Sequence, residues 1–396
     1  MLTNIVFLII IFSLIVTVSL ILKHQILSPW SITPFIWAVI LFLYICVKDE
    51  LYAVPTQFVT GITIWVLTFS GASFIAYSFF PKYKKRPWAV CEKNVDIITL
   101  MTLILVPFAV YKAIQHAVMM ASPEGLFYTL REQAVNPEEN QLGIVKYFIY
   151  VINVLLIIEL NRDKIRKRRL SLIVILCILF FIATMAKLTL LMYIFSGLYI
   201  LYNKKRISLK PIALFIFFII SLVPIMQLLR QGGDNNTDGE MIGNILLIYT
   251  ISSIIAFGTI TPYSSMQWGE TTFRPFYNIL HGLGFNVMPT EALQDFELVP
   301  MPTNVYTVMF PYYKDFGFEG IFIFALLEGI AIGAIYKYSK SGCNIMTYLY
   351  AYIFTLLIMQ FFDELIMQGI SAILQTIIII IICHTNISLR KKTLNV

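Results

Sequence analysis

The segment from Met301 to Gly320 carries the residues of this chain that are best suited to binding and activating a hydroxylated ligand. It contains the phrases PTNVYT and YYKDFGFEG, which bring hydroxyl, amide, aromatic and carboxylate groups close together. Aromatic rings stack on sugar rings, and amide and hydroxyl groups hydrogen-bond to sugar hydroxyls. Asn304, Tyr306 and Tyr313 are therefore candidate sugar-binding residues. The same composition is also typical of an interfacial tyrosine belt with a turn at Asp-Phe-Gly, and that alternative stays open.

Three cations lie where positive charge is otherwise scarce. Arg131 is the single basic residue of the acidic segment 116–143, Arg230 ends an apolar run, and Lys187 occupies the short turn ATMAK between two apolar runs. Arg offers two parallel donors and Lys a point charge, so these residues form a candidate phosphate site, with Arg274 as a weaker fourth member. The alternative for each is a cation at a span end that extends to lipid headgroups without a further role.

A reaction at a hydroxyl group also needs a proton acceptor within hydrogen-bond reach. Asp315, at the head of an apolar run, is the first candidate base, and His281 in the phrase NILHGLG is the second. The alternatives are a helix-capping role for Asp315 at a helix that begins at Phe316, and a structural role for His281. Glu328 lies inside an apolar run, where a charge is costly, so we expect it to face protein and to be structural.

Hydrophobic helices must position these residues. Of the 396 residues, 59% are hydrophobic and 13% are charged, far from the typical composition of soluble domains. Runs of about 17 to 25 apolar residues cross a bilayer. The sequence predicts an all-α polytopic membrane protein, a single membrane domain over 1–396, with about eleven spans: 3–22, 29–47, 57–80, 95–115, 144–160, 170–186, 188–202, 209–229, 317–336, 345–362 and 367–385.

The distribution of Lys and Arg predicts which loops face the cytoplasm. Basic residues cluster at 82–86, 162–169, 204–206 and 390–392, and such clusters mark cytoplasmic loops. The charged residues of segments 116–143 and 230–316 are mainly acidic, and both segments are predicted to be periplasmic loops. The apolar segment 244–262 is predicted to lie at the interface or to re-enter. The formal net charge of +7 is then a topology signal, and no nucleic-acid partner is expected.

Several classes of chemistry lack support in the sequence. The five cysteines lie in predicted spans or on the inner side, so a disulfide framework is not indicated. The chain contains no CxxC, HExxH, GxxxxGK[ST] or GxGxxG motif, so neither a metal nor a nucleotide cofactor is expected.

The phrases PTNVYT and YYKDFGFEG, the latter at the head of a span, resemble the signature of the Wzy-type O-antigen polymerases, the oligosaccharide repeat-unit polymerases. The resemblance implies a metal-independent glycosyltransferase of the bacterial inner membrane that acts in lipopolysaccharide or other surface-polysaccharide biosynthesis. It implies donor and acceptor oligosaccharides linked to undecaprenyl diphosphate, with a chain-length regulator as a further partner. Related polymerases and ligases often place Arg or Lys in a Ser/Thr-rich turn at the position of Lys187, whereas the turn here is ATMAK.

Two other functions stay open. An O-antigen ligase performs the same transfer to lipid A-core instead of to another repeat unit. A lipid-linked oligosaccharide flippase is a transporter, but it would be expected to line its spans with charge and to keep its outer loops short, whereas this chain places its polarity in one long loop.

Overall fold

The regular structure of the chain is almost entirely helical. The computed structural model describes residues 2–21, 26–48, 51–83, 88–120, 125–136, 141–208, 251–291, 294–299 and 302–385. The helices of this part are α1 (Leu2–Ile21), α2 (Pro29–Val47), α3 (Thr56–Phe79), α4 (Glu92–Met120), α5 (Leu126–Val135), α6 (Phe148–Asn161), α7 (Lys167–Thr184), α8 (Lys187–Asn203), α11 (Arg274–Gly282), α12 (Phe310–Lys340), α13 (Asn344–Ile358) and α14 (Ile370–His384).

Short elements connect some of these helices. Three 3₁₀ turns, η2 (Gly143–Tyr147), η3 (Phe257–Thr259) and η4 (Met359–Phe361), lie beside α6, α3 and α13. Two strands of two residues each, β1 (Glu297–Leu298) and β2 (Pro302–Thr303), pair antiparallel with Glu297 opposite Thr303. This small ribbon fixes the chain directly before α12.

Seven helical segments in the described part are long and apolar enough to cross a membrane: Leu2–Ile21, Pro29–Cys46, Thr56–Phe79, Glu92–Met120, Gly143–Asn161, Phe310–Lys340 and Asn344–Phe361. The chain is therefore a multi-pass all-α membrane protein. Helices α7, α8 and α14 coincide with three further predicted spans. The predicted span 209–229 and the segment 244–250 lie outside the described residues, so the total of eleven crossings stays a prediction.

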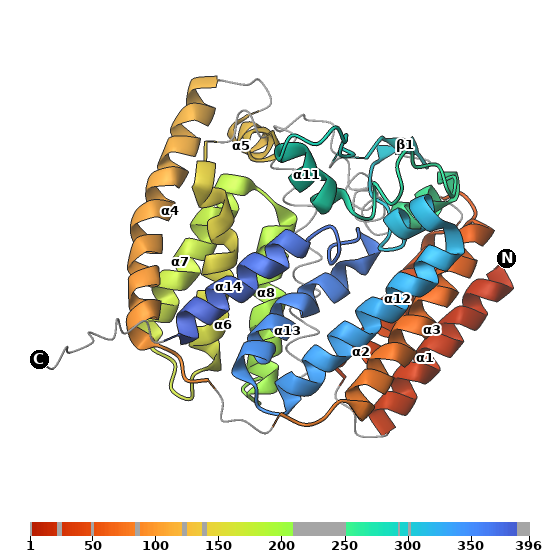
Figure 1. Ribbon diagram of the computed structural model, residues 1–396, viewed down its shortest axis with the longest axis horizontal. Helices are drawn as coiled ribbons and strands as arrows, with labels where there is room; N and C mark the ends of the chain where they lie inside the picture. The colour runs from red at the N-terminus through yellow and green to blue at the C-terminus, as the bar shows by residue number, and fades with distance from the viewer. Residues whose placement is uncertain are drawn as a thin grey trace, which may run out of the picture.

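The helices form two groups joined by a central pair (Figure 1). Helices α1, α2, α3 and α12 pack together on one side, and α4, α6, α7 and α8 pack on the other. Helix α13 contacts α12 and α2 in the first group and α8 and α6 in the second, while α14 contacts α13, α6 and α4. Because α13 is buried along most of its length, it forms the centre of the bundle.

The closest helix pair is α3 with α12, and glycine makes this approach possible. A Cβ at Gly333 would lie 2.3 Å from the backbone oxygen of Ser73, and a Cβ at Gly329 would lie 2.8 Å from the backbone oxygen of Phe69. The two glycines are four residues apart, the spacing that lets membrane helices bring their backbones together. This pair holds α12 in a fixed position against α3.

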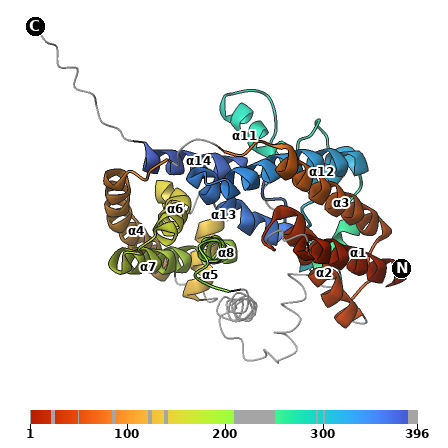
Figure 2. The ribbon, with the colours of Figure 1, turned by 90° about the horizontal axis from the view of Figure 1, so that it is seen from below.

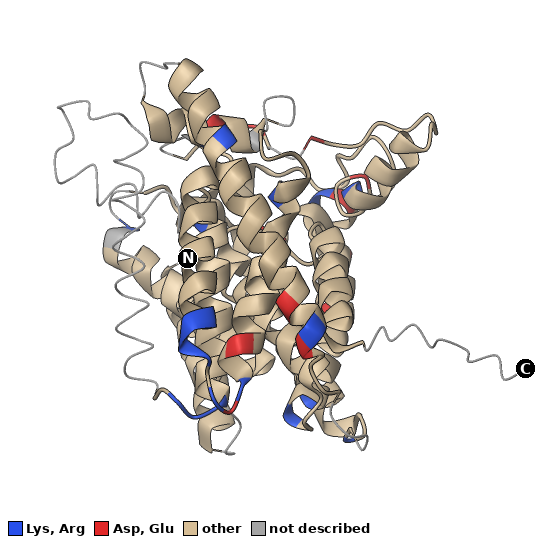
Figure 3. Cartoon of the chain, turned by 90° about the vertical axis from the view of Figure 1, so that its left-hand side faces the viewer, with Lys and Arg blue, Asp and Glu red and all other residues tan. Residues whose placement is uncertain are grey.

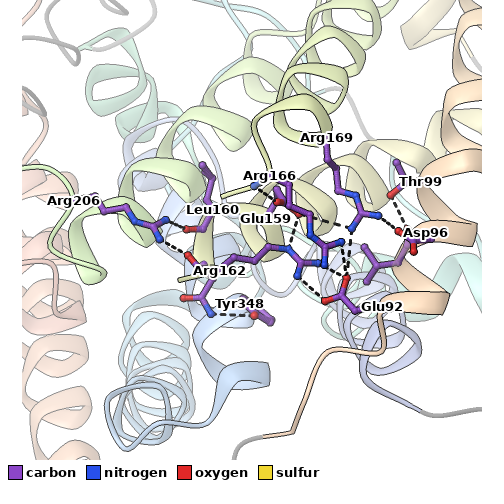
Figure 4. A network of polar contacts seen from close by, with 12 residues as sticks. Glu92, Asp96, Thr99, Glu159, Leu160, Arg162, Arg166, Arg169, Arg206 and Tyr348 are labelled. Atoms are coloured by element: carbon purple, nitrogen blue, oxygen red, sulfur yellow. Dashed lines mark hydrogen bonds and ion pairs between the residues drawn. The ribbon is translucent and has the colours of Figure 1, made fainter. Parts of the chain in front are cut away.

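The charged residues lie in two zones with a band of few charges between them (Figure 3). One zone is the end where α4 begins and α6 ends, and Figure 4 shows its ion-pair network. The Glu159 carboxylate, 1% exposed, accepts hydrogen bonds from Arg162 Nε at 2.6 Å and from the Arg166 backbone N–H at 2.8 Å. Arg162 also binds Glu92 with both terminal nitrogens, at 2.6 and 2.9 Å.

These ion pairs show a second role for the basic cluster at 162–169. They tie α4, α6 and α7 together at one end of the bundle, and Arg206, after α8, donates to the carbonyl oxygens of Leu160 and Arg162. The predicted cytoplasmic cluster is therefore part of the packing of four helices. Which side of the membrane it faces stays a prediction.

Candidate functional site

Toward the opposite end of the bundle lies a group of buried and half-buried polar side chains, four of them acids, which we call the acidic centre. Its members come from the first two-thirds of α12, from the turn between α13 and α14, and from the start of α11: Arg274, Tyr312, Asp315, Glu328, Asp363 and Glu364. Two hydrogen bonds join the three segments. Val308 N donates to Gln360 O at 2.9 Å, and Gln368 Nε2 donates to Thr271 O at 3.2 Å.

Asp315 anchors the loop before α11. Its side chain is 7% exposed, and its carboxylate accepts hydrogen bonds from the Ser265 hydroxyl, from Thr271 N at 3.4 Å and from Thr272 N at 2.6 Å. The alternative prediction, that Asp315 caps a helix beginning at Phe316, is wrong, because its carboxylate does not bind the backbone of α12. Helix α12 already begins at Phe310, and the carboxylate binds backbone groups of another segment instead.

Gly317 breaks α12 immediately after this carboxylate. Its φ of 64° and ψ of −150° are not helical, and a Cβ there would lie 2.7 Å from the Tyr263 hydroxyl oxygen. Glycine is therefore needed both for the positive φ and for the close approach of the loop. The predicted turn at Asp-Phe-Gly is thus present as a break within a longer helix, and it lets Asp315 reach across to Thr271 and Thr272.

Behind Asp315, two further members of the acidic centre lie in the core of the bundle. The Tyr312 hydroxyl donates to Glu328 Oε1, and both side chains are buried. The other carboxylate oxygen, Glu328 Oε2, has no hydrogen-bond partner within the described part of the chain. The expectation that Glu328 faces protein is confirmed, since it lies against Tyr312 and interacts electrostatically with Glu364.

Glu364 and Asp363 form a pair of unlike acids in the turn before α14. Glu364 is fully buried, and its carboxylate accepts backbone hydrogen bonds from Ile366, Met367 and Gln368 at 2.7 to 2.9 Å. Asp363 is half-buried, and its Oδ1 accepts a single backbone hydrogen bond, from Glu364 N at 2.8 Å. Glu364 is thus fixed by the turn, while Asp363 keeps acceptor capacity for a ligand.

Burial raises the pKa of Asp363 from its usual value of 3.8 to about 7, and the nearby charge of Glu364 acts in the same direction. The Glu364 backbone N–H and Arg274 oppose this shift. Desolvation also raises the pKa of Glu364. A carboxyl group with a pKa near neutrality can both take up and release a proton at physiological pH.

Arg274 supplies the positive charge of the acidic centre. It is the first residue of α11 and is half-buried, and its Nη1 donates to the Glu291 carbonyl oxygen at 3.3 Å. Burial lowers its pKa, whereas the attraction of Asp363 and Glu364 raises it. Arg274, predicted as a weaker phosphate ligand, therefore interacts electrostatically with two carboxylates.

The predicted sugar-binding residues lie mostly inside the protein. Tyr306 is 6% exposed, stacks on Phe310 with ring centroids 4.6 Å apart, and donates to Asp295 O at 3.3 Å. Burial raises the pKa of Tyr306 to about 12. Tyr313 is 3% exposed and packs against Phe257 and Phe318. Asn304 is half-buried.

The other predicted site residues lie on separate elements. Arg131 is on α5, which packs against α4 and α7, and Lys187 is the first residue of α8. Arg230 lies outside the described residues, so the convergence of the three cations stays a prediction. His281 is exposed on α11, and its Nδ1 lies 2.9 Å from Val287 O.

The Asp363–Glu364 pair was not predicted from the sequence, although a signal for it exists. These two acids are the only Asp, Glu, Lys or Arg residues between Lys340 and Arg390. They lie directly at the end of an apolar span, and ionisable residues that enter the membrane are costly unless they are paired or functional. Their partners on α11 and α12 could not be inferred from sequence spacing.

Searches against protein-family models, curated proteins and solved structures give no match to this chain. Among the described residues, no group of three or more His, Cys, Asp or Glu side chains could hold a metal ion.

Proposed function

We propose that the chain is a membrane glycosyltransferase that extends a glycan carried on a lipid diphosphate, as an O-antigen or related surface-polysaccharide polymerase does. The observation that carries this proposal is the acidic centre. It places a half-buried carboxyl group with a raised pKa beside an arginine, at the end of α12 where the PTNVYT and YYKDFGFEG phrases lie. The resemblance of those phrases to repeat-unit polymerases supports the same activity.

The proposed setting is the bacterial inner membrane, crossed eleven times. The acidic centre then faces the periplasm, because the basic clusters lie at the opposite end of the bundle and mark the cytoplasmic side. The donor and the acceptor are both oligosaccharides linked to undecaprenyl diphosphate. A chain-length regulator is a further proposed partner.

In the proposed reaction, the acceptor hydroxyl oxygen attacks the anomeric carbon of the donor sugar. The bond between that carbon and the diphosphate oxygen breaks, and the lipid diphosphate leaves with the bonding electron pair. Asp363 takes the proton of the acceptor hydroxyl. Its raised pKa suits this transfer, since a base works best when its pKa lies near the operating pH.

The leaving diphosphate gains negative charge, which preorganised cations stabilise. Arg131, Arg230 and Lys187 are the proposed ligands of the diphosphate. Arg274 has a different role in this scheme, because its charge lies beside Asp363 and favours the ionised form of that base. Asp315 holds the loop of Thr271 and Thr272 in place over the site.

A reconstituted assay tests the proposal. The purified protein in lipid nanodiscs receives a polyprenyl-diphosphate-linked oligosaccharide, and electrophoresis follows the length of the product. We expect a ladder of products, and we expect Asp363→Asn to slow its formation by about 10² to 10⁴-fold, the usual contribution of general acid–base catalysis. Asn can still accept the Glu364 N–H, so the turn should persist.

The matched control is Asp163→Asn, whose side chain is 97% exposed at the opposite end of the bundle and pairs with Lys204. This variant should form the ladder at the wild-type rate. Absence of any ladder from wild-type protein, with transfer of a single unit in a parallel reaction that contains lipid A-core as acceptor, would favour a ligase. A ladder formed at the wild-type rate by Asp363→Asn would remove Asp363 from the mechanism.

A further inference from the structure

Helix α11 has one apolar and one polar face, and none of its residues is buried. Phe276, Ile279, Leu280 and Leu283 follow the spacing of one helix face, and they are 38 to 72% exposed. The polar residues Arg274, Asn278 and His281 follow the same spacing on the other face. A soluble loop would not leave such an apolar stripe in water, so a partner must cover it.

Exposed apolar residues continue on both sides of the helix. Phe285 and Met288 follow α11, and Met266 and Trp268 precede it. Each of these side chains is more than half exposed. The surface is therefore larger than the helix itself, and we call it the α11 apolar surface, made of Met266, Trp268, Phe276, Ile279, Leu280, Leu283, Phe285 and Met288.

A row of aromatic rings connects this surface to the side of α12. The ring centroids of Trp268 and Phe273 are 5.5 Å apart, and those of Phe273 and Phe324 are 5.9 Å apart. Phe324 belongs to α12 and is only 7% exposed, so these rings pack the loop before α11 against the buried side of α12. Phe322 and Ile323, in the same turn of α12, are exposed on a candidate span, so the loop before α11 is held next to a lipid-facing stretch of α12.

Helix α11 also projects beyond the outline of the bundle. Figure 2 shows it outside the cross-section of the membrane helices, beside α12 and α14, and Figure 3 shows the same overhang near one end of the bundle. The side of a membrane-spanning bundle faces lipid. An element that overhangs that side close to the end of a span lies above the hydrocarbon layer at the depth of the headgroups.

We propose that α11 and the turn after it lie in the interfacial layer of the bilayer, with the α11 apolar surface buried between lipid headgroups and acyl chains. Amphipathic helices of this kind insert their apolar face about 5 to 10 Å into the interface. Arg274, the first residue of α11, would then lie on the polar face of this interfacial helix. The proposal depends on the membrane-spanning bundle and not on the proposed enzymatic activity.

Spin-label depth measurements in nanodiscs test this inference. In a chain whose five cysteines are replaced, Leu283→Cys carries the label on the apolar face and Asn278→Cys carries it on the polar face of the same helix. The label at position 283 should collide readily with oxygen and rarely with a water-soluble nickel chelate. The label at position 278 should show the opposite preference.

Three spin-label results would overturn the inference. Frequent nickel collisions at both positions would place α11 in water. Dipolar broadening between labels at position 283 would show that a second copy of the chain covers the surface, and exclusion of both reagents there would show cover by protein. Tryptophan fluorescence gives a second test if the cysteine-free chain does not fold. Lipids brominated near the headgroup should quench the fluorescence of wild type more than that of Trp268→Phe. Equal quenching of the two proteins would contradict the proposal.

Discussion

Replacing Asp315 with Asn should release the loop before α11 without removing any atom from it. One oxygen of the carboxylate accepts from the Ser265 hydroxyl and from Thr271 N, and the other accepts from Thr272 N. An amide has only one acceptor oxygen, so at least one backbone N–H loses its partner. Hydrogen bonds to charged groups contribute about 1.5 to 3 kcal/mol each. We therefore expect Asp315→Asn to weaken the anchoring of the loop by about 2 to 3 kcal/mol.

Amide hydrogen exchange of the protein in nanodiscs measures this change directly. Since about 1.4 kcal/mol corresponds to a factor of ten, Thr271 and Thr272 should exchange about 30 to 150 times faster in the variant. The control is Asp295→Asn, an exposed residue between α11 and α12. Exchange at the wild-type rate in Asp315→Asn would refute the anchoring role. If polymerisation also ceased under that result, Asp315 would be the stronger candidate for the base.

Two other changes test the structure at separate places. The pKa of Asp363 is raised from 3.8 to about 7 in the folded protein, so its contribution to stability is fully present at low pH and is lost as the pH rises to 7. In thermal unfolding, the stability of wild type relative to Asp363→Asn should therefore fall between these pH values, and a constant difference would exclude the shift. The polymerisation rate should rise with pH up to about 7 in wild type only. Gly333→Ala places a Cβ 2.3 Å from Ser73 O and should lower the free energy of unfolding by about 1 to 3 kcal/mol. Gly71→Ala is the control, because a Cβ there has nothing within 4 Å and should not destabilise the protein. Equal stabilities of the two variants would contradict the close packing of α3 on α12.

The helices of the bundle could be predicted because apolar run length is a local property of the sequence. The predicted spans 29–47 and 188–202 agree closely with α2 (Pro29–Val47) and α8 (Lys187–Asn203). The predicted span 317–336 begins at the break in α12, but the helical part before it, from Phe310, is not predicted. The polar residues of YYKD hide these nearly two turns, in which Tyr312 and Tyr313 pack against the core.

The candidate site was harder to predict because side-chain direction and partner choice depend on the assembled bundle. Tyr306 and Tyr313 have the right chemistry for sugars, yet each packs against Phe rings of neighbouring segments. The phrase YYKDFG does not reveal that its carboxylate binds Thr271 and Thr272, more than forty residues earlier in the chain. Local composition therefore indicates which residues could act, while long-range contacts decide which of them remain accessible.

The contrast between the two aspartates decides which one suits proton transfer. A base must offer an unoccupied lone pair and a pKa that lets it hold a proton briefly. Asp315 meets three donors, so receiving a proton would break part of the loop anchor. Asp363 meets one backbone donor, and desolvation has already raised its pKa. Environments that separate two carboxyl groups in this way separate their roles. In the proposed reaction, Asp363 is therefore better suited to be the base, and Asp315, inside the YYKDFGFEG phrase, is better suited to holding the loop.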